Sequence, residues 1–260
     1  MSVVPSTLAG LPVRLEVPLA PSLPLRGTRA TAEAWVEVHD EAALITLIRE
    51  ARAEKLAVRV LTPLTDALPP EGGLTGICVR LGAGFERIED GTAGLRVGAG
   101  VPLAVVGLRS GFEALRGAPG VLADALAEGW IAPMVAQTRR FRSRSIEEVD
   151  GCVAFDAKCV FVGATLRPGS KPTWVPRAGQ AFQPVKRRDL RALLGELGLA
   201  GLRLGGAGLA EDDPTVLTNR GEATPKQMRL LVQAVIERVH VARGIEVEER
   251  LTAPGRGGRL

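Results

Sequence analysis

The sequence predicts a protein of the α+β class with a small C-terminal domain. Two observations lead to this prediction. Residues 35–99 contain one amphipathic helical pattern among several short apolar runs, in the order strand–helix–strand and then further strands. The last third of the chain instead shows two helical patterns with clear capping residues. With 260 residues, 46% of them apolar, the chain is long enough to bury a sizeable core.

The first elements follow from turn residues and hydrophobic periodicity. Residues 1–24 are rich in proline and are expected to form an extended lead-in. Strands are expected at 35–38 and 57–61. Asp40 can cap a helix between them, because a short acidic side chain accepts hydrogen bonds from free N–H groups at a helix start. The apolar positions of that helix fall on one face: Leu44, Leu47, Ile48 and Ala51.

The middle of the chain is less regular. Residues 121–129 are ambiguous, and residues 130–150 are polar and poorly patterned. Residues 168–176 contain three prolines and are expected to be a linker at the main domain boundary. Further elements are expected as strands at 76–81, 85–89, 95–99 and 159–166, a helix starting in 103–108, and a Gly/Pro turn at 114–120.

The last third shows the clearest signals. A helix is expected at 189–197, ended by Gly198. Thr224 and Gln227 have the spacing of a capping box, with a proline between them at the favoured first helical position. Gly244 closes that helix, and residues 245–251 are expected to form a final strand. The buried face of the long helix is expected to hold Met228, Leu231, Val232, Val235 and Val239.

Composition excludes several classes of function. The net charge of +4 comes from 33 basic and 29 acidic residues that are well mixed, so no nucleic-acid partner is expected. The basic stretches 139–144 and 186–191 are more readily solvated faces than phosphate sites. Three cysteines and two histidines indicate neither a disulfide framework nor a metal site. No membrane-length apolar run or signal sequence is visible, so we expect a cytoplasmic monomer without membrane insertion.

Three motifs in the C-terminal third resemble those of a known family. Residues 198–207 read GLAGLRLGGA, residues 218–224 read TNRGEAT, and the long helix ends in GIEVE at 244–248. Without gaps, these segments are similar to the C-terminal pattern of the MurB family. The family comprises the flavin-dependent UDP-N-acetylmuramate dehydrogenases, also called UDP-N-acetylenolpyruvoylglucosamine reductases.

Weaker matches extend the resemblance over nearly the whole chain: VGAGV at 97–101, GAPG at 117–120 and AGQAFQP at 178–184. The resemblance implies a MurB-like α+β fold. A two-lobed FAD-binding domain of the PCMH/VAO type, with a shortened second lobe, precedes a small α+β domain. The stretch between Ala125 and Gln180 is shorter than in most family members, so apart from the strand at 159–166 we expect the helices and strands that complete the second lobe to be absent. The implied boundaries are a lead-in at 1–24, the FAD-binding-type domain at 25–167 (lobe 1 about 25–115, lobe 2 about 116–167), a linker at 168–176 and the MurB C-terminal-type domain at 177–260.

The resemblance also implies a reaction. In the family, NADPH reduces FAD, and the reduced flavin passes a hydride to the enol ether of UDP-N-acetylglucosamine enolpyruvate. The product, UDP-N-acetylmuramate, is a peptidoglycan precursor, so the role belongs to cell-wall biogenesis, cell shape and cell division. The implied cofactors are FAD and NADPH, and the implied ligand is a UDP-sugar.

The implied cofactor contacts lie in two loops. The family's flavin-phosphate loop aligns with TPLTDAL at 62–68, which lacks the glycines that let backbone N–H groups approach phosphates closely. In that loop Thr65 keeps a hydroxyl, whereas Asp66 adds a negative charge. The second flavin loop keeps Gly117, Pro119 and Gly120, for which a plain tight turn is an equal alternative.

The catalytic positions are substituted. The family's proton-donating serine aligns with Gln180, whose amide has no proton of useful acidity, so a polar turn residue is the alternative. The family's glutamate aligns with Arg250, or with Glu249 after a one-residue slip that would reverse the face in a strand. Its arginine aligns with Lys158, which lacks the forked guanidinium and is otherwise a surface lysine. The catalytic candidates are therefore Glu249 and Lys158.

Arg203 and Asn219 match kept family positions and are candidates for substrate contact, with capping or bridging of loops as the alternative. Two functions remain open. The first is a working UDP-N-acetylmuramate dehydrogenase. The second is a catalytically inactive MurB-like protein that binds a nucleotide sugar or a cell-wall or division partner, which the substituted positions favour. A flavoprotein oxidase of related fold is a third, weaker hypothesis.

Overall fold

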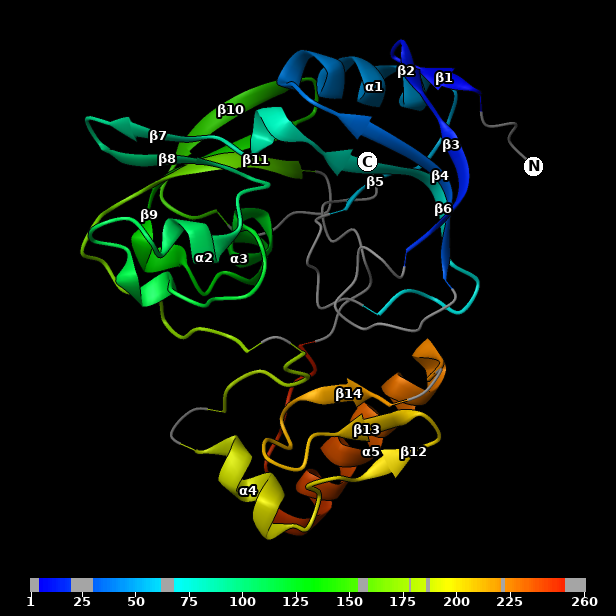
Figure 1. Ribbon diagram of the computed structural model, residues 1–260, viewed down its shortest axis with the longest axis vertical. Coiled ribbons are helices and arrows are strands. Elements are labelled where there is room, and N and C mark those ends of the chain that lie inside the picture. The colour runs from blue at the N-terminus through cyan, green and yellow to red at the C-terminus, as the bar shows by residue number, and fades with distance from the viewer. Residues whose placement is uncertain are drawn as a thin grey trace.

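The protein has a two-lobed body and a smaller C-terminal domain, joined by an extended segment (Figure 1). The computed structural model describes residues 5–19, 30–61, 68–153, 159–177, 179–185, 188–220 and 223–250. In this part of the chain, every helix is too short or too polar to cross a membrane.

Lobe 1 is a four-stranded sheet covered by one helix. Its strand order is β3-β4-β6-β5, with β3 antiparallel to β4 and the other pairs parallel. As predicted, Asp40 caps the helix by accepting a hydrogen bond from the Ala43 N–H, and all four residues of the predicted face are buried. The elements are β3 (Arg14–Pro18), β4 (Thr31–Val38), α1 (Glu41–Ala53), β5 (Val58–Leu61) and β6 (Leu74–Leu81).

The described part of the proline-rich start is more structured than a lead-in. A short hairpin, β1 (Thr7–Leu8) and β2 (Leu11–Pro12), comes before β3. Strand β3 then adds to the edge of the lobe 1 sheet, where Arg14 lies opposite Trp35. Edge positions tolerate prolines, since they leave the missing N–H on the unpaired side.

Lobe 2 is an antiparallel five-stranded sheet in the order β10-β9-β11-β8-β7. Two predictions were wrong here. The strand expected at 85–89 is a 3-10 turn followed by β7, and the region 125–180 contains two strands that were not predicted, β9 and β10, whereas β11 confirms the strand predicted at 159–166. The elements are η2 (Ala83–Phe85), β7 (Ile88–Gly91), β8 (Gly94–Gly98), α2 (Leu103–Val106), η3 (Glu113–Leu115), α3 (Leu122–Glu128), η4 (Ala132–Met134), β9 (Val135–Arg142), β10 (Ser145–Asp150) and β11 (Cys159–Leu166).

Cross-strand charge pairs explain why β9 and β10 escaped sequence reading. Arg139 lies opposite Glu148, and Arg140 lies opposite Glu147, with nitrogen–oxygen distances of 3.0 and 2.6 Å. Opposite charges facing each other stabilise a strand pair, but they leave no alternation of apolar and polar residues to recognise. The basic stretch that starts at Arg139 is thus partly neutralised by carboxylates.

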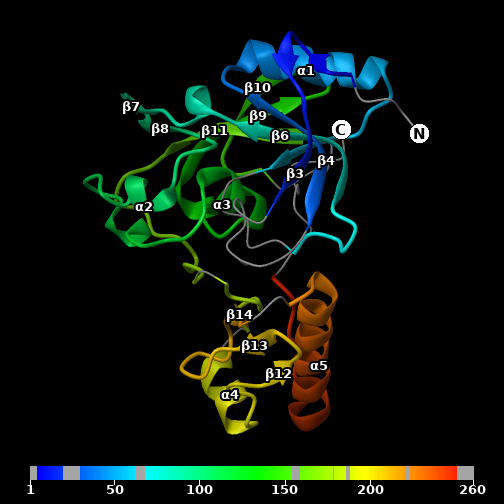
Figure 2. The ribbon, with the colours of Figure 1, turned by 45° about the vertical axis from the view of Figure 1, so that its right-hand side comes forward.

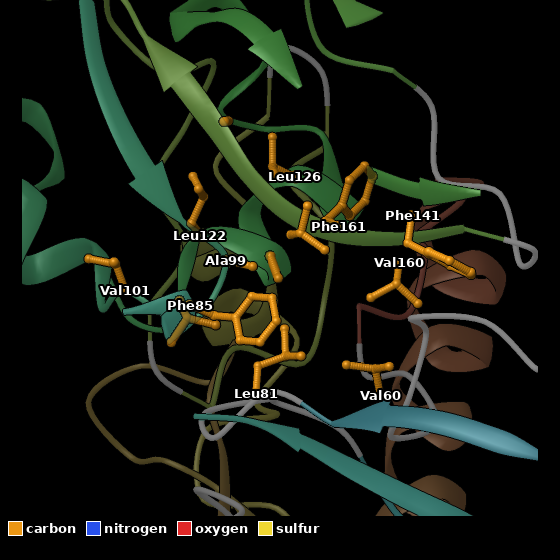
Figure 3. Packing of buried hydrophobic residues seen from close by; sticks show 14 of the residues in the cluster. Val60, Leu81, Phe85, Ala99, Val101, Leu122, Leu126, Phe141, Val160 and Phe161 are labelled. Atoms are coloured by element: carbon orange, nitrogen blue, oxygen red, sulfur yellow. The ribbon is translucent and has the colours of Figure 1, made fainter. Parts of the chain in front are cut away.

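Both lobes share one hydrophobic core. Val60 and Leu81 of lobe 1 face Phe85, Phe141 and Val160 across the junction (Figure 3). Each of these side chains is at most 4% exposed. This shared core fixes the two sheets relative to each other, while a smaller cluster around Trp35 and Leu61 is buried separately in lobe 1.

The C-terminal domain has its own core, in which α5 packs beside a small sheet (Figures 1 and 2). Both predicted helices are confirmed: Asp189 caps α4, and α5 has the Thr224–Gln227 capping box and a left-handed Gly244 at its end. The final strand was wrong, because 245–250 makes only an isolated bridge between Phe182 and Glu249. The elements are α4 (Leu190–Glu196), β12 (Arg203–Leu204), β13 (Ala207–Leu209), β14 (Leu217–Asn219) and α5 (Pro225–Arg243).

Candidate functional site between lobe 2 and the C-terminal domain

The two positions aligned with the family's serine and glutamate meet in space. The segment after the linker runs beside the end of the described chain, where the Arg250 N–H donates to the Ala181 carbonyl at 2.8 Å. The guanidinium Nη1 of Arg250 also donates to the Gln180 carbonyl at 3.1 Å. Residues 70 positions apart are thus brought into one junction.

The side-chain amide of Gln180 hydrogen-bonds to the backbone of its own turn. Its Oε1 accepts a hydrogen bond from the Arg177 N–H, and its Nε2 donates to the Phe182 carbonyl, both at 3.0 Å. An amide held at both ends orients the backbone and supplies no acidic proton. The structure thus gives Gln180 the contacts of the polar turn residue that was the alternative in the sequence.

Arg250 forms a forked ion pair with Glu128 at the end of α3. Its Nε and Nη2 each lie 3.0 Å from one carboxylate oxygen. The two side chains are only 4% and 15% exposed. The guanidinium carbon lies 5.8 Å from the centre of the Trp174 ring. In place of a free carboxyl acid, the junction holds a buried, charge-balanced pair.

Glu249 faces another direction. Its carboxylate accepts a hydrogen bond from Gln233 Nε2 of α5 at 3.2 Å. Partial burial raises the pKa of Glu249, while the hydrogen bond from Gln233 and the positive charge of Arg229 act in the opposite sense. A raised pKa suits a general acid, but the group contacts the helix of its own domain.

The predicted cofactor residues are only partly described. Thr65, Asp66 and Lys158 lie outside the described residues. Gly117 and Gly120 have left-handed backbone, with φ of 76° and 82°, and flank Pro119 in a tight turn. A Cβ atom on Gly117 would meet nothing within 4 Å. The turn therefore leaves open space next to its backbone.

The start of α3, directly after this turn, is already satisfied internally. The Val121 N–H donates to the Asp124 carboxylate, and those of Leu122 and Ala123 donate to backbone carbonyls at 3.0 Å. A helix start binds phosphate through free N–H groups. The first turn of α3 has none to offer, and Asp124 adds a negative charge there.

One buried donor on lobe 1 does fit a bound group. Trp35 is 5% exposed, and its indole Nε1 has no hydrogen-bond partner among the described residues. It packs in a cluster with Leu61, the residue directly before the segment aligned with the phosphate loop. An unsatisfied buried N–H costs about 1–3 kcal/mol. A ligand oxygen at this place would remove that cost.

The two substrate candidates lie on the small sheet. Arg203 is exposed and lies 3.7 Å from Glu211, which also pairs with Arg220 at 3.4 Å. Asn219 accepts a hydrogen bond from the Ala223 N–H at 3.1 Å and so shapes the loop before α5. Asn219 thus makes the kind of capping contact given as its alternative role, whereas the Arg203 guanidinium stays accessible.

A separate cavity of about 330 Å³ opens between α1 and the lobe 2 sheet. None of the residues predicted for the site lines it. Its walls carry charges of both signs, and Arg139 there lies 3.0 Å from Glu41. The sequence did not predict this cavity, because its polar and charged residues come from five helices or strands and two turns: His39, Asp40, Glu41, Arg87, Glu89, Arg96, Arg139 and Glu148.

Comparison with known proteins first defines the class of fold. The structure is similar to that of UDP-N-acetylenolpyruvylglucosamine reductase (MurB) from Thermus caldophilus, with a TM-score of 0.71 at 21% identity. The match covers 93% of this chain and 99% of the other. The chain thus has the MurB fold, in which a two-lobed body of the FAD-binding type carries a small C-terminal domain.

Sequence comparison then gives the family. The family model of the UDP-N-acetylenolpyruvoylglucosamine reductase C-terminal domain matches residues 171–252. The reductase of Heliobacterium modesticaldum is 28% identical, over 84% of this chain and 83% of that protein. The reductase of Desulfosudis oleivorans is also 28% identical, over 88% and 90%. The chain therefore resembles the MurB reductases over most of its length, and residues 171–252 match the C-terminal domain of that family.

Proposed function

We propose that the protein is a reductase of the MurB class that converts UDP-N-acetylglucosamine enolpyruvate to UDP-N-acetylmuramate with NADPH and FAD. One observation carries the proposal. Gln180 and Arg250, which occupy the positions aligned with the family's serine and glutamate, meet at the junction of lobe 2 and the C-terminal domain. This contact supports a ligand site at the junction, although both side chains differ from those of the family.

For FAD, the described residues offer two contacts. The Trp35 indole N–H can donate to a ligand oxygen, and the backbone at Gly117 is open to the approach of a ligand, whereas Gly120 lies against the Asp124 carboxylate. The first turn of α3 contributes none, so phosphate binding relies on lobe 1. When bound, FAD supplies the hydride chemistry of the class.

For the UDP-sugar, the exposed Arg203 is the best phosphate contact on the C-terminal domain. Arg203 and Arg220 share the single carboxylate of Glu211, which leaves this group a net positive charge. A diphosphate can compete with Glu211 for the guanidinium groups, because all three side chains are solvent-exposed and screened. The proposal assigns Asn219 to holding this loop in place.

Proton delivery is the weak step of the proposed reaction. Gln180 has no acidic proton, and the Arg250 guanidinium is permanently charged. A positioned general acid typically contributes about 100- to 10,000-fold to a rate. We therefore expect turnover lower by about that factor than in a relative with the serine and glutamate in place, with solvent water as the proton source.

The test combines three measurements on the purified chain: flavin absorbance after denaturation, calorimetric binding of the UDP-sugar substrate, and NADPH oxidation with substrate and added FAD. Bound flavin with slow, substrate-dependent NADPH oxidation supports the proposal. A colourless protein that binds the UDP-sugar, takes up no FAD and oxidises no NADPH would instead support the inactive alternative. Failure to bind the UDP-sugar would reject the proposal and would leave, of the inactive alternative, only a protein that binds a cell-wall or division partner.

A further inference from the structure

The Glu128–Arg250 pair joins parts of the molecule that are distant in the chain. The two residues are 122 positions apart. Glu128 is the last residue of α3 in lobe 2, whereas Arg250 ends the described part of the C-terminal domain. Across this junction they form an ion pair in which both carboxylate oxygens are bound.

All three nitrogens of the guanidinium are used. Two hold Glu128, and the third donates to the Gln180 carbonyl at 3.1 Å. The Arg250 side chain is 4% exposed, so this charge is removed from water. A charge buried this deeply is tolerated only with a complete set of partners, and removing one partner is strongly destabilising.

The linker also contacts the region around Arg250. The N–H and the hydroxyl of Thr173 both donate to the Trp130 carbonyl, at 2.9 and 3.0 Å. The rings of Trp130 and Trp174 lie 6.5 Å apart, and the Arg250 guanidinium lies over Trp174. Lobe 2, the linker and the C-terminal domain thus meet at one cluster.

Glu128 needs its cation for a second reason. Carbonyl groups at the end of a helix carry partial negative charge, so a carboxylate at the last residue of α3 is unfavourable by itself. Arg250 relieves this repulsion, and Glu128 in return neutralises the guanidinium. Each charge therefore lowers the free-energy cost of burying the other.

We infer that Glu128 and Arg250 form an interdomain clasp that holds the C-terminal domain against lobe 2, and that the two residues are a compensating pair. The inference goes beyond the proposed function and holds whether or not the chain reduces a substrate. It also explains why a cation can occupy the position aligned with the family's glutamate. A lone Arg250→Glu change would set two carboxylates against each other.

The clasp is testable by trypsin cleavage of the linker. Cleavage after Arg177 reports detachment, because Arg167 and Lys171 are each followed by proline and resist trypsin. Breaking the pair with Glu128→Ala or Arg250→Ala should raise the cleavage rate on the order of 100- to 1,000-fold, the range typical of a broken buried pair. Glu211→Ala, which removes an exposed glutamate that also pairs with arginine, should change it less than about fivefold.

If a substitution to alanine prevents folding, two milder variants still test the inference. Glu128→Gln retains the shape and removes only the charge. Glu128→Leu combined with Arg250→Met replaces the pair with apolar groups and should return cleavage to within about tenfold of the parent rate. In a Trp35→Phe background, only Trp130 and Trp174 contribute tryptophan fluorescence. Their emission spectrum should change when the ion pair is broken and should return to that of the parent in the apolar double variant.

Double-variant coupling decides the outcome. If the clasp exists, Glu128→Ala adds little to Arg250→Ala, since the pair is already broken. Additive effects of the two substitutions, or single effects no larger than that of Glu211→Ala, would overturn the inference.

Discussion

The C-terminal domain and the two-lobed body differ in how far apart their structural partners lie in the chain. Helix α5 begins at a capping box four residues wide and ends at one left-handed glycine. In the body, β8 pairs with β11, and β3 joins the sheet through β4. Local signals build most of the small domain, whereas long-range pairing builds the body. The motifs differ in the same way: the gapless family pattern lies in the small domain, whereas the matches in the body are short and scattered.

The largest expected effect separates the two cores. Phe141 is 1% exposed and lies in the shared core of the two lobes. Phe141→Ala should lower the free energy of unfolding of the body by about 3–5 kcal/mol through lost burial and a cavity. Hydrogen exchange of β11 amides should accelerate, while α5 amides keep their protection. Equal acceleration in both would show that the two cores unfold as one.

The reciprocal substitution is Met228→Ala, at a fully buried position of α5. It should cost the C-terminal domain about 2–5 kcal/mol, because it empties the centre of the second core. Amides of α5 should then exchange faster than those of β11. Leu230→Ala on the exposed side of the same helix is the control and should change neither.

The local signals can be compared between the two regions by removing one cap from each. Thr224→Ala and Asp40→Ala should each cost about 0.5–2 kcal/mol, since each leaves a helix-start N–H without its side-chain acceptor. Thr224→Ser and Asp40→Asn keep an acceptor and should restore most of the loss, measured by urea unfolding. If Thr224→Ser lost as much stability as Thr224→Ala, and Asp40→Asn as much as Asp40→Ala, capping would not be the cause.

The smallest expected effect concerns the pH dependence of stability at Glu249, which contacts α5 in the C-terminal domain. Because the folded-state pKa of Glu249 is raised above its usual value, the folded state favours the protonated carboxyl. Its contribution to stability is therefore fully present below the unfolded pKa and is lost as pH rises through the folded pKa. Glu249→Gln should raise stability at neutral pH by less than about 1 kcal/mol, given solvent screening. Thermal melts from pH 4 to 8 measure this. A parent chain and variant with the same pH profile would contradict it.

Sequence reading succeeded where an element is specified within one or two turns of itself. Asp40, Thr224 and Gly244 each act on N–H or carbonyl groups a few residues away. It failed at β9 and β10, where charged residues are stabilised by partners on the opposite strand and, for Arg139, on helix α1. It also failed at the final strand, because a strand exists only if a partner of matching length is available, and there only one bridge forms.

For the candidate site, the sequence indicated which positions to compare but not what their side chains contact. Gln180 and Arg250 were identified by alignment alone. That Glu128 would bind Arg250 had no signal in the sequence, because ion pairs across a junction have no fixed spacing. The charged cavity beside α1 was missed for the same reason.

By itself, the amino-acid sequence indicated the resemblance to the MurB reductases and determined the small domain's two helices, because these depend on local spacing and on residue chemistry; that catalytic positions are substituted stays a prediction. Only the tertiary structure decided that lobe 2 is a five-stranded sheet and that Arg250 is held by Glu128. Both depend on which distant segments come to lie side by side, and the energy of a buried charge depends on those neighbours more than on the residue itself.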